Sequence, residues 1–239
     1  MGGRRPALRA AANQAIARSD DLFNFFPFWV RFVLACARFQ PDLIHANNEP
    51  VSNRAALLSG KMLSVPVISH VRGPTNGEVL TRWLYRLPDH YIPVSRWVSE
   101  NIGQLGIPVA RRTVVYDGIE LENLNVNADG RAFRAHLGIP EKAFAVGLVG
   151  LLIPWKGQHL FLDAARRLAK VVPGLRMVLV GGTPEECVPY EKELRARVER
   201  EGLAETVMFT GHVRDMPAAY NSLDVVVSAS TSPEPLGTV

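Results

Sequence analysis

The chain has 239 residues, of which 47% are hydrophobic and 21% charged, and its formal net charge is +4. This length and composition allow one large domain or two modest ones with a real core, and they exclude a largely disordered chain. The two cysteines, Cys36 and Cys187, lie far apart without the spacing of metal ligands. They therefore indicate a reduced, cytoplasmic setting and no metal site.

The positive charge is concentrated at the start of the chain. Residues 1–41 carry six arginines against two aspartates, which accounts for the whole net charge. Such a basic N-terminal arm could contact anionic lipid at the inner face of the membrane, and it could equally be a solvated helix end. Motifs of RNA or DNA binding are missing, so nucleic acid is not an expected partner.

An aromatic-rich stretch, Leu22–Cys36, follows within this basic region. Pro27 and Arg31 interrupt it, so it falls short of the roughly 18–20 apolar residues that a membrane span needs. The stretch predicts a buried or interfacial helix.

From residue 39 onward, short apolar runs alternate with helical stretches, which is typical of βαβ units around a parallel sheet. The sequence predicts a series of strands at Leu43–Ala46, Val65–His70, His90–Val94 and Thr113–Tyr116. It predicts helices between them at Asn53–Leu63, Val79–Leu87 and Arg96–Leu105, the last with Ser95 as its N-cap.

The polar stretch 120–130 contains three asparagines and predicts a connector. We therefore place a domain boundary there, with a first domain at 1–122 and a second at 123–239. The second domain is expected to contain strands at Phe144–Val149, Met177–Val180, Val207–Phe209 and Val225–Val227. Its expected helices are Phe133–Leu137, capped by Gly138, then Gln158–Val172, Tyr190–Glu201 and Pro217–Ser222.

Loops of small residues follow four of these strands, and ligands of open parallel sheets bind at such carboxyl ends. The loops contain Gly150, Gly181 and His212, and the last one runs from Ser230 to Gly237. Lys156 is the cation among them, just before a helix start, where it could neutralise a diphosphate without a metal. The alternative is an ordinary surface lysine.

The final loop holds one carboxylate, Glu234, between Pro233 and Pro235, which restrict the backbone on both sides of it. Gly237 would open a following helix whose free N–H groups suit a phosphate. The alternative is a proline-rich loop with a solvated glutamate.

Dinucleotide binding has weaker support. Gly147 and Gly150 lie three residues apart without the third glycine of the usual fingerprint, and no acidic residue follows at the ribose-binding distance. A nicotinamide-dependent oxidoreductase is therefore disfavoured, and the phosphate-binding loop of NTPases is missing as well.

From about Pro41 to Val239 the chain resembles the retaining nucleotide-sugar glycosyltransferases of GT-B architecture, the large family four group. The resemblance rests on eight short motifs that occur in the family's order and spacing. They are Pro41–His45, Val65–Ile68, Val94–Ser95, Val114–Ile119, Pro154–Gln158, Leu179–Gly182, Phe209–His212 and Ser232–Gly237.

The resemblance implies an α/β fold of two Rossmann-like domains, with the acceptor side in the first and nucleotide-sugar binding in the second. It implies that Lys156 neutralises the donor diphosphate and that Glu234 lies at the donor sugar or the reacting face. Backbone or hydroxyl contacts to phosphate would come from Gly237 and Thr238, while His212 and Val213 would flank the base. No cofactor or metal is implied, and the acceptor would be either lipid-linked or a saccharide.

Three departures from the family pattern qualify this expectation. Leu151 stands near the place of an arginine that partners the lysine, and Arg72 stands where the family often has histidine, with His70 two residues earlier. Arg72 could bind phosphate or an acidic acceptor. The family's second glutamate would fall beyond Val239, so we expect both domains to be incomplete and the chain to be a fragment. The alternative function is a truncated module that binds a nucleotide or nucleotide sugar without turnover.

Overall fold

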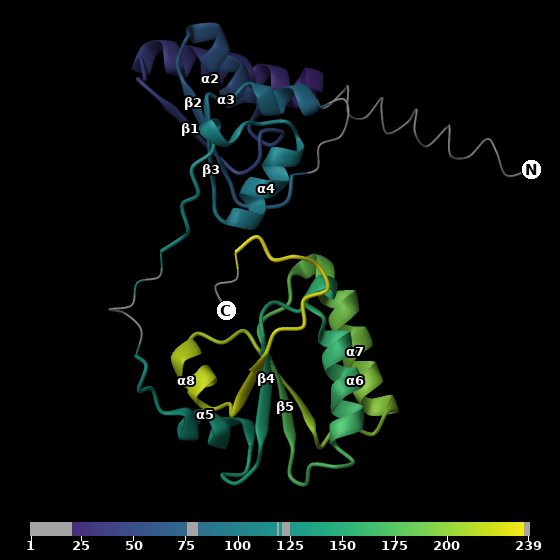
Figure 1. Cartoon of the computed structure of the whole chain (residues 1–239). Helices are drawn as coiled ribbons and strands as arrows, with labels where there is room; N and C mark the ends of the chain where they lie inside the picture. Colours follow the sequence, from purple (N-terminus) through teal and green to yellow (C-terminus); the bar gives the residue numbers. More distant parts are fainter. Residues whose placement is uncertain (1–20, 76–80, 119, 121–124, 237–239) are drawn as a thin grey trace, which may run out of the picture. The chain divides into compact units, whose positions relative to one another are not determined.

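The computed structural model describes residues 21–75, 81–118, 120 and 125–236. Within them the chain divides into two compact units, 1–117 and 118–239, each built on its own parallel sheet (Figure 1). The basic arm before residue 21 and the positions Gly237 and Thr238 lie outside the described residues.

The first unit contains a three-stranded parallel sheet in the order β1-β2-β3. Its strands are β1 (Ile44–Asn47), β2 (Val67–Val71) and β3 (His90–Pro93). Its helical segments are η1 (Asp21–Phe25), α2 (Phe26–Phe39), α3 (Arg54–Leu63), η2 (Arg82–Arg86), α4 (Arg96–Gln104) and η3 (Val109–Arg111).

Alternation along β1 sets the core of this unit. Ile44 and Ala46 are buried while His45 and Asn47 are exposed, and Ile44 pairs in register with Val67 of β2. Because successive side chains of a strand point to opposite faces, this register collects the apolar residues on one face. They pack there with buried residues of α2, α3 and η2, whereas the His45 side of β1 remains exposed.

The α4 helix begins as the sequence predicts, because the Ser95 hydroxyl accepts a hydrogen bond from the Val98 N–H at 3.2 Å.

The predicted fourth strand, Thr113–Tyr116, is not a regular strand. The Thr113 N–H donates to the Tyr91 carbonyl at 2.9 Å, so the segment does lie along β3. The reciprocal donor of a parallel ladder would be the nitrogen of Pro93, which carries no hydrogen, so the ladder stays incomplete.

The second unit contains a four-stranded parallel sheet in the order β6-β5-β4-β7. Its strands are β4 (Ala145–Val149), β5 (Arg176–Val180), β6 (Val207–Gly211) and β7 (Val225–Val227). Its helical segments are α5 (Gly130–Leu137), η5 (Pro154–Lys156), α6 (Gln158–Leu168), η6 (Glu185–Cys187), α7 (Val188–Arg200) and α8 (Met216–Asn221).

Helices cover both faces of this sheet, with α6 and α7 on one face and α5 and α8 on the other (Figure 1). Met177 and Leu179 of β5 contribute to the core beside α6 and α7, while Val178 and Val180 contribute to the core beside α8. Because helices cover both faces of the sheet, the central strand β4 is buried along its whole length. A strand covered in this way has a continuous apolar sequence instead of an alternating one.

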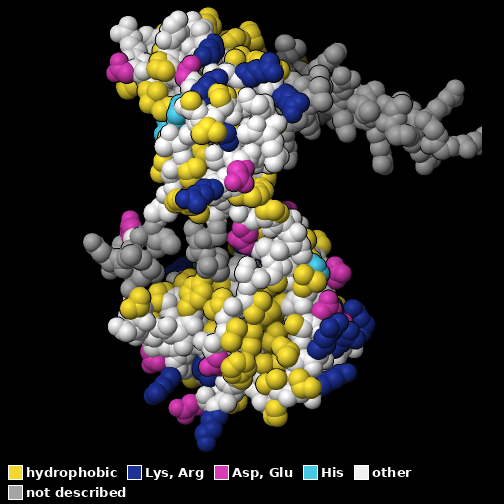
Figure 2. Space-filling view, in the orientation of Figure 1, with side chains coloured by type: hydrophobic (Ala, Val, Ile, Leu, Met, Phe, Trp, Pro, Cys, Tyr) yellow, Lys and Arg dark blue, Asp and Glu magenta, His cyan; other side chains and the backbone are white. Residues whose placement is uncertain are grey.

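The edge strand β7 differs from β4, because Val225 and Val226 are 42% and 45% exposed. Figure 2 shows hydrophobic side chains on the surface of this unit, where Figure 1 places β7 and β4.

Gly138 ends α5 in the left-handed conformation, with φ of 69°, as its predicted C-cap role requires. No helix of the described residues has both the length and the apolar character needed to span a bilayer.

Candidate functional site

The candidate site lies in the second unit, where the parallel strands β4, β5, β6 and β7 end. Four loops begin there and contain Gly150, Gly181, His212 and the segment 228–234. Because β4 lies between β5 and β7 in the sheet, the loop after β4 has neighbours on both sides. The sheet order thus brings together loops that are separate in sequence.

Two glycines allow these loops to pack in contact. Gly181 has φ of +148°, and a Cβ atom there would lie 2.0 Å from the Gly150 carbonyl oxygen. Gly157 has φ of +77°, and a Cβ atom there would lie 1.9 Å from the Ala229 carbonyl oxygen. Neither position accepts a side chain unless the backbone moves, so these glycines hold the loops after β4, β5 and β7 against one another.

The loop after β7 is also tied to the turn that carries Lys156. The Thr231 N–H donates to the Trp155 carbonyl at 2.7 Å, and the Thr231 hydroxyl donates to the same oxygen at 3.2 Å. Behind the turn, the fully buried Gln158 donates its side-chain amide to the Leu151 carbonyl at 2.8 Å. Both sides of the site are therefore built on anchored backbone.

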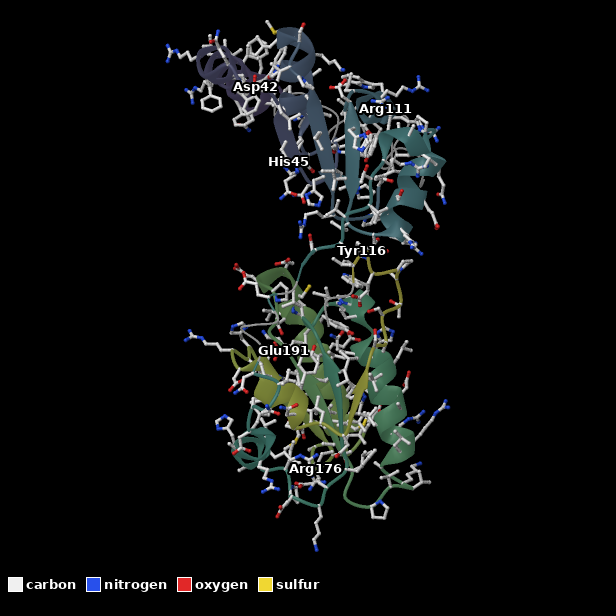
Figure 3. The ribbon with its side chains drawn as sticks, turned by 60° about the vertical axis from the view of Figure 1, so that its left-hand side comes forward. Asp42, His45, Arg111, Tyr116, Arg176 and Glu191 are labelled. Carbon is white, nitrogen blue, oxygen red and sulfur yellow. The ribbon has the colours of Figure 1, made fainter. Side chains whose placement is uncertain are left out.

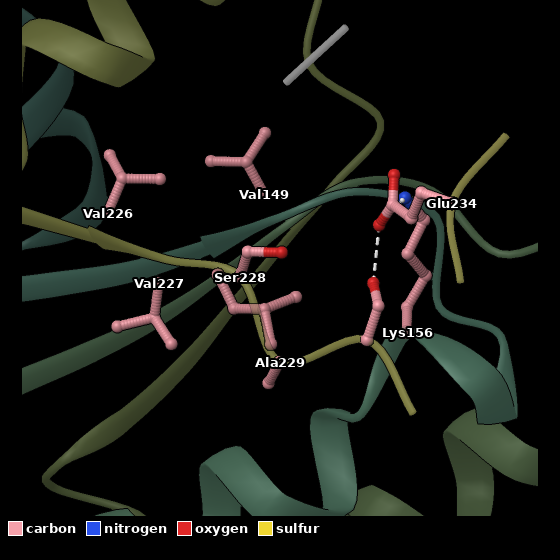
Figure 4. A pocket seen from close by; sticks show the side chains of 9 residues that line it. Val149, Lys156, Val226, Val227, Ser228, Ala229 and Glu234 are labelled. Carbon is pink, nitrogen blue, oxygen red and sulfur yellow. Dashed lines mark hydrogen bonds and ion pairs between the residues drawn. The ribbon is translucent and has the colours of Figure 1, made fainter. Parts of the chain in front are cut away.

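Lys156 and Glu234 form the charged centre of the site. The Lys156 Nζ donates to Glu234 Oε1 at 2.8 Å, and the two side chains are only 14% and 21% exposed. The Ser230 hydroxyl donates to the same carboxylate oxygen. Figure 4 shows the Glu234 carboxylate next to Lys156, on the loop that follows β7. The ammonium group also lies 4.7 Å from the centre of the Trp155 ring, a cation–π distance.

The surroundings of Glu234 act on its pKa in opposite directions. Burial raises the pKa of the carboxyl, whereas the hydrogen bonds from Lys156 and Ser230 and the charge of Lys156 lower it. The net result is a pKa below the ordinary glutamate value. The carboxylate is therefore held in its ionised form at neutral pH.

A pocket of about 370 Å³ opens beside this pair (Figure 4). The apolar part of its lining comes from the ends of β4 and β7, and the polar part comes from Lys156, Ser228, Ser230 and Glu234. Its lining residues are Leu148, Val149, Lys156, Val226, Val227, Ser228, Ala229, Ser230 and Glu234. Apolar walls with a few convergent polar groups are typical of small-molecule sites.

Three further residues that the sequence singles out, Gly150, His212 and Val213, lie in the loops that follow β4 and β6. Gly150 adopts φ of +149° and donates its N–H to the Val180 carbonyl at 2.8 Å. His212 is exposed and lies next to Gly182. A Cβ atom added at Gly182 would lie 3.4 Å from the Cβ of His212. Val213 is half-buried and packs on the α8 side of the core.

Arg72, which the sequence suggests could bind phosphate or an acidic acceptor, belongs to the first unit, where it follows β2. Its guanidinium is exposed and pairs with the carboxylate of Asp117. Nearby, the rings of His70 and His45 stack with centroids 5.5 Å apart, and His45 lies exposed on β1 (Figure 3). Burial lowers the pKa of His70, and the charges of Arg72 and His45 lower it further against the opposing effect of Asp117.

Sequence reasoning did not single out Ser230 or Trp155. Ser230 lies within a run of small and hydroxyl residues four positions before Glu234, and Trp155 directly precedes Lys156. Neither spacing marks a site by itself. Only the folded structure shows that the loop after β7 lies beside the turn after β4, where Ser230 contacts Glu234 and Trp155 contacts Lys156.

Two family models match the chain over adjoining ranges. Residues 129–239 match the model described as glycosyl transferases group 1, and residues 5–123 match the model described as glycosyltransferase family 4.

The chain is also similar to individual curated proteins, at just under 30% sequence identity. The lipopolysaccharide core biosynthesis mannosyltransferase LpsB of Rhizobium meliloti is 29% identical over 149 residues, or 62% of this chain and 40% of that protein. The sulfoquinovosyl transferase SQD2 of Arabidopsis thaliana is 28% identical over 228 residues, which cover 87% of this chain and 42% of that protein.

Among solved structures, Anabaena Alr3699/HepE in complex with UDP-glucose superposes with a TM-score of 0.74 at 27% identity. The match covers 91% of this chain and 60% of that one. A glycosyltransferase from Rickettsia africae has a TM-score of 0.77 at 15% identity, which shows a shared fold. The chain thus spans about 40% of the length of the two curated relatives and about 60% of these solved structures.

Proposed function

Because the chain belongs to the group 1, family 4 glycosyltransferases of GT-B architecture, we propose that its activity is sugar transfer from a nucleotide-sugar donor to an acceptor. We further propose that the configuration at the transferred carbon is retained. The observation that carries this proposal is the half-buried Lys156–Glu234 pair at the carboxyl end of a parallel sheet.

The donor is expected to bind with its diphosphate at Lys156. The charge that develops on the leaving diphosphate would be met by this ammonium group and by backbone N–H groups, without a catalytic metal. Gly150 and Gly181 lie in the loops that follow β4 and β5, and the lack of a side chain at both positions would let the backbone come close to the ligand. Gly237 and Thr238 are proposed as further phosphate contacts.

Glu234 is proposed as the carboxylate that faces the donor sugar, and its lowered pKa supports an ionised acceptor of sugar hydroxyls. His212 and Val213 are proposed to flank the base. On the acceptor side, proposed for residues 1–122, Arg72 is the candidate for binding a phosphate or another acidic group of the acceptor. The donor-binding role is proposed for residues 123–239.

Ligand binding tests the proposal. We expect UDP, UDP-glucose or the matching guanosine or adenosine ligands to raise the melting temperature of the chain, with nicotinamide adenine dinucleotide as the negative control. A ligand present at 100 times its Kd stabilises a protein by about 2.7 kcal/mol, which shifts melting by several degrees. Stabilisation by the nicotinamide dinucleotide alone, or by none of these ligands, would contradict a nucleotide-sugar site.

Turnover distinguishes the transferase from a module that binds without reacting. We expect release of free sugar or its transfer to a lipid-linked or saccharide acceptor, with the anomeric configuration of the donor, as read by NMR. Binding without any release or transfer would favour the binding module.

The α2 helix carries features that suit contact with a membrane surface. Phe26, Phe28, Leu34 and Phe39 are each more than half exposed, and the described part of this helix carries arginines and no acidic residue. Figure 2 shows hydrophobic and basic side chains together on the part of the first unit that carries α2. Aromatic and basic side chains in one helix are a combination that favours an anionic bilayer surface. We therefore propose peripheral membrane contact through α2 and the basic arm.

Vesicle binding tests this contact. We expect the chain to cosediment with vesicles of phosphatidylcholine and phosphatidylglycerol at low salt, and binding to fade as ionic strength rises. Phe28→Ser should weaken the binding because an inserted aromatic ring is lost, whereas Val171→Ser, at an exposed valine of the second unit, is the matched control. Equal cosedimentation with neutral and anionic vesicles would indicate a solvated helix instead.

A further inference from the structure

Two donors meet at one oxygen of Glu234. Both the Lys156 ammonium and the Ser230 hydroxyl donate to Oε1, so this oxygen has two hydrogen-bond donors. Lys156 is also the cation proposed to hold the donor diphosphate. The ammonium thus has an anionic partner within the chain, and a diphosphate that binds Lys156 must compete with that partner.

We propose that Ser230 is a positioning residue, which holds Glu234 in place when Lys156 exchanges the carboxylate for the donor diphosphate. The inference rests on the proposed function, since it concerns the same site. It adds a role for Ser230 and an exchange of partners at Lys156.

Charge explains why an exchange is needed. A diphosphate that approaches Lys156 also approaches the Glu234 carboxylate, and like charges at such distances repel. The repulsion falls if the carboxylate leaves the ammonium group. The Ser230 hydroxyl is neutral, so its hydrogen bond to Glu234 is not opposed by the ligand charge.

The position of Ser230 suits this role. The next residue, Thr231, is anchored to the Trp155 carbonyl through its N–H and its hydroxyl. On the other side, the Ala229 carbonyl lies against Gly157, where no side chain could be accommodated. The backbone on both sides of Ser230 is therefore fixed independently of Lys156, and the hydroxyl can orient the carboxylate after the lysine has turned to the ligand.

The exchange predicts proton uptake on binding. In the free chain, burial raises the pKa of Glu234 but Lys156 and Ser230 lower it more. When Lys156 turns to the diphosphate, its contribution is lost and the ligand charge is added, so the pKa rises. Lys156 and Glu234 are the titratable groups among the described residues that line the pocket. The affinity for the diphosphate ligand should therefore rise as the pH falls through the interval between the pKa of Glu234 in the complex, which is the higher, and its pKa in the free chain.

The experiment is calorimetric titration of UDP and of UDP-glucose into the wild-type chain and its variants. UDP-glucose is the probe for proton uptake because it lacks the terminal phosphate, whose pKa of about 6 would obscure the signal. Repeating the titration in buffers of different ionisation enthalpy measures the protons taken up. We expect uptake at acidic pH in the wild type and none in Glu234→Gln.

Two substitutions separate the exchange from positioning. Glu234→Gln should bind UDP about three- to tenfold tighter, because the diphosphate no longer displaces a carboxylate from a half-buried ion pair. Ser230→Ala should leave UDP affinity within about twofold but weaken UDP-glucose several-fold, because only the sugar needs an oriented Glu234. Ser230→Thr keeps the hydroxyl and should therefore retain the wild-type affinity for UDP-glucose. Ser232→Ala is the matched control.

Each result decides the question. Equal weakening of UDP and UDP-glucose by Ser230→Ala would mean that Ser230 only supports the loop, and this would overturn the positioning role. Unchanged or weaker UDP binding by Glu234→Gln would overturn the exchange. A wild-type chain that binds neither these ligands nor their guanosine and adenosine counterparts would overturn both this inference and the proposed function, whereas binding without these variant effects would overturn the inference alone.

Discussion

Lys156→Ala is expected to weaken the binding of a nucleoside diphosphate by about 1.5–3 kcal/mol, the range for a hydrogen bond to a charged group. The ammonium is half-buried on an anchored turn at the mouth of the pocket, so little freedom is lost when it engages a phosphate. Among the residues that line this pocket in the described part of the chain, Lys156 is the one cation. Its removal leaves the ligand charge to backbone N–H groups alone.

Isothermal titration of UDP into the wild type, Lys156→Ala and Lys170→Ala measures this effect. Lys170 is an exposed lysine just beyond α6, so its substitution removes the same charge away from the pocket. The two variants should have similar far-ultraviolet circular dichroism. Equal affinity of all three proteins would remove Lys156 from the donor site.

Gly157→Ala is expected to lower the free energy of unfolding of the second unit by about 2–5 kcal/mol. A left-handed backbone costs a residue other than glycine about 1–2 kcal/mol, and overpacking adds about 1–3 kcal/mol. The second contribution arises because the new Cβ would lie 1.9 Å from the Ala229 carbonyl oxygen. Moving that carbonyl also displaces the loop that carries Ser230 and Glu234, so ligand affinity should fall together with stability.

Gly174→Ala provides the matched control. Gly174 has nearly the same φ, +71° against +77°, but its Cβ would have no neighbour within 4 Å. Urea unfolding of the two variants therefore separates backbone strain from the collision with Ala229. If both substitutions lowered the unfolding midpoint equally, the contact between the two loops would contribute nothing to the stability of the site.

Several local features could be predicted because they depend on neighbours in sequence. Ser95 caps α4 and Gly138 ends α5 as predicted, since both motifs are closed by hydrogen bonds within a few residues. Periodicity also located most helices and strands, although Gln158–Val172 is shorter than predicted and ends as a helix at Leu168. The prediction failed at Thr113–Tyr116, because an apolar run does not reveal which strand it will lie beside, here β3, in which Pro93 lacks an N–H.

Local sequence patterns are enough to predict the α/β class, the order of strands and loops, and the presence of Lys156 and Glu234 in loops that follow strands. These properties follow from hydrophobic periodicity and from glycine and proline, which act over short distances along the chain. Which loops come into contact depends instead on the folded arrangement of the strands. Because β7 pairs with β4, Glu234 reaches Lys156 across 78 positions of sequence, and Ser230 joins the same carboxylate. Arg72 likewise acquired Asp117 as its partner through folding. Such pairings depend on sheet order and on the direction in which each loop leaves its strand, and local sequence carries no record of either.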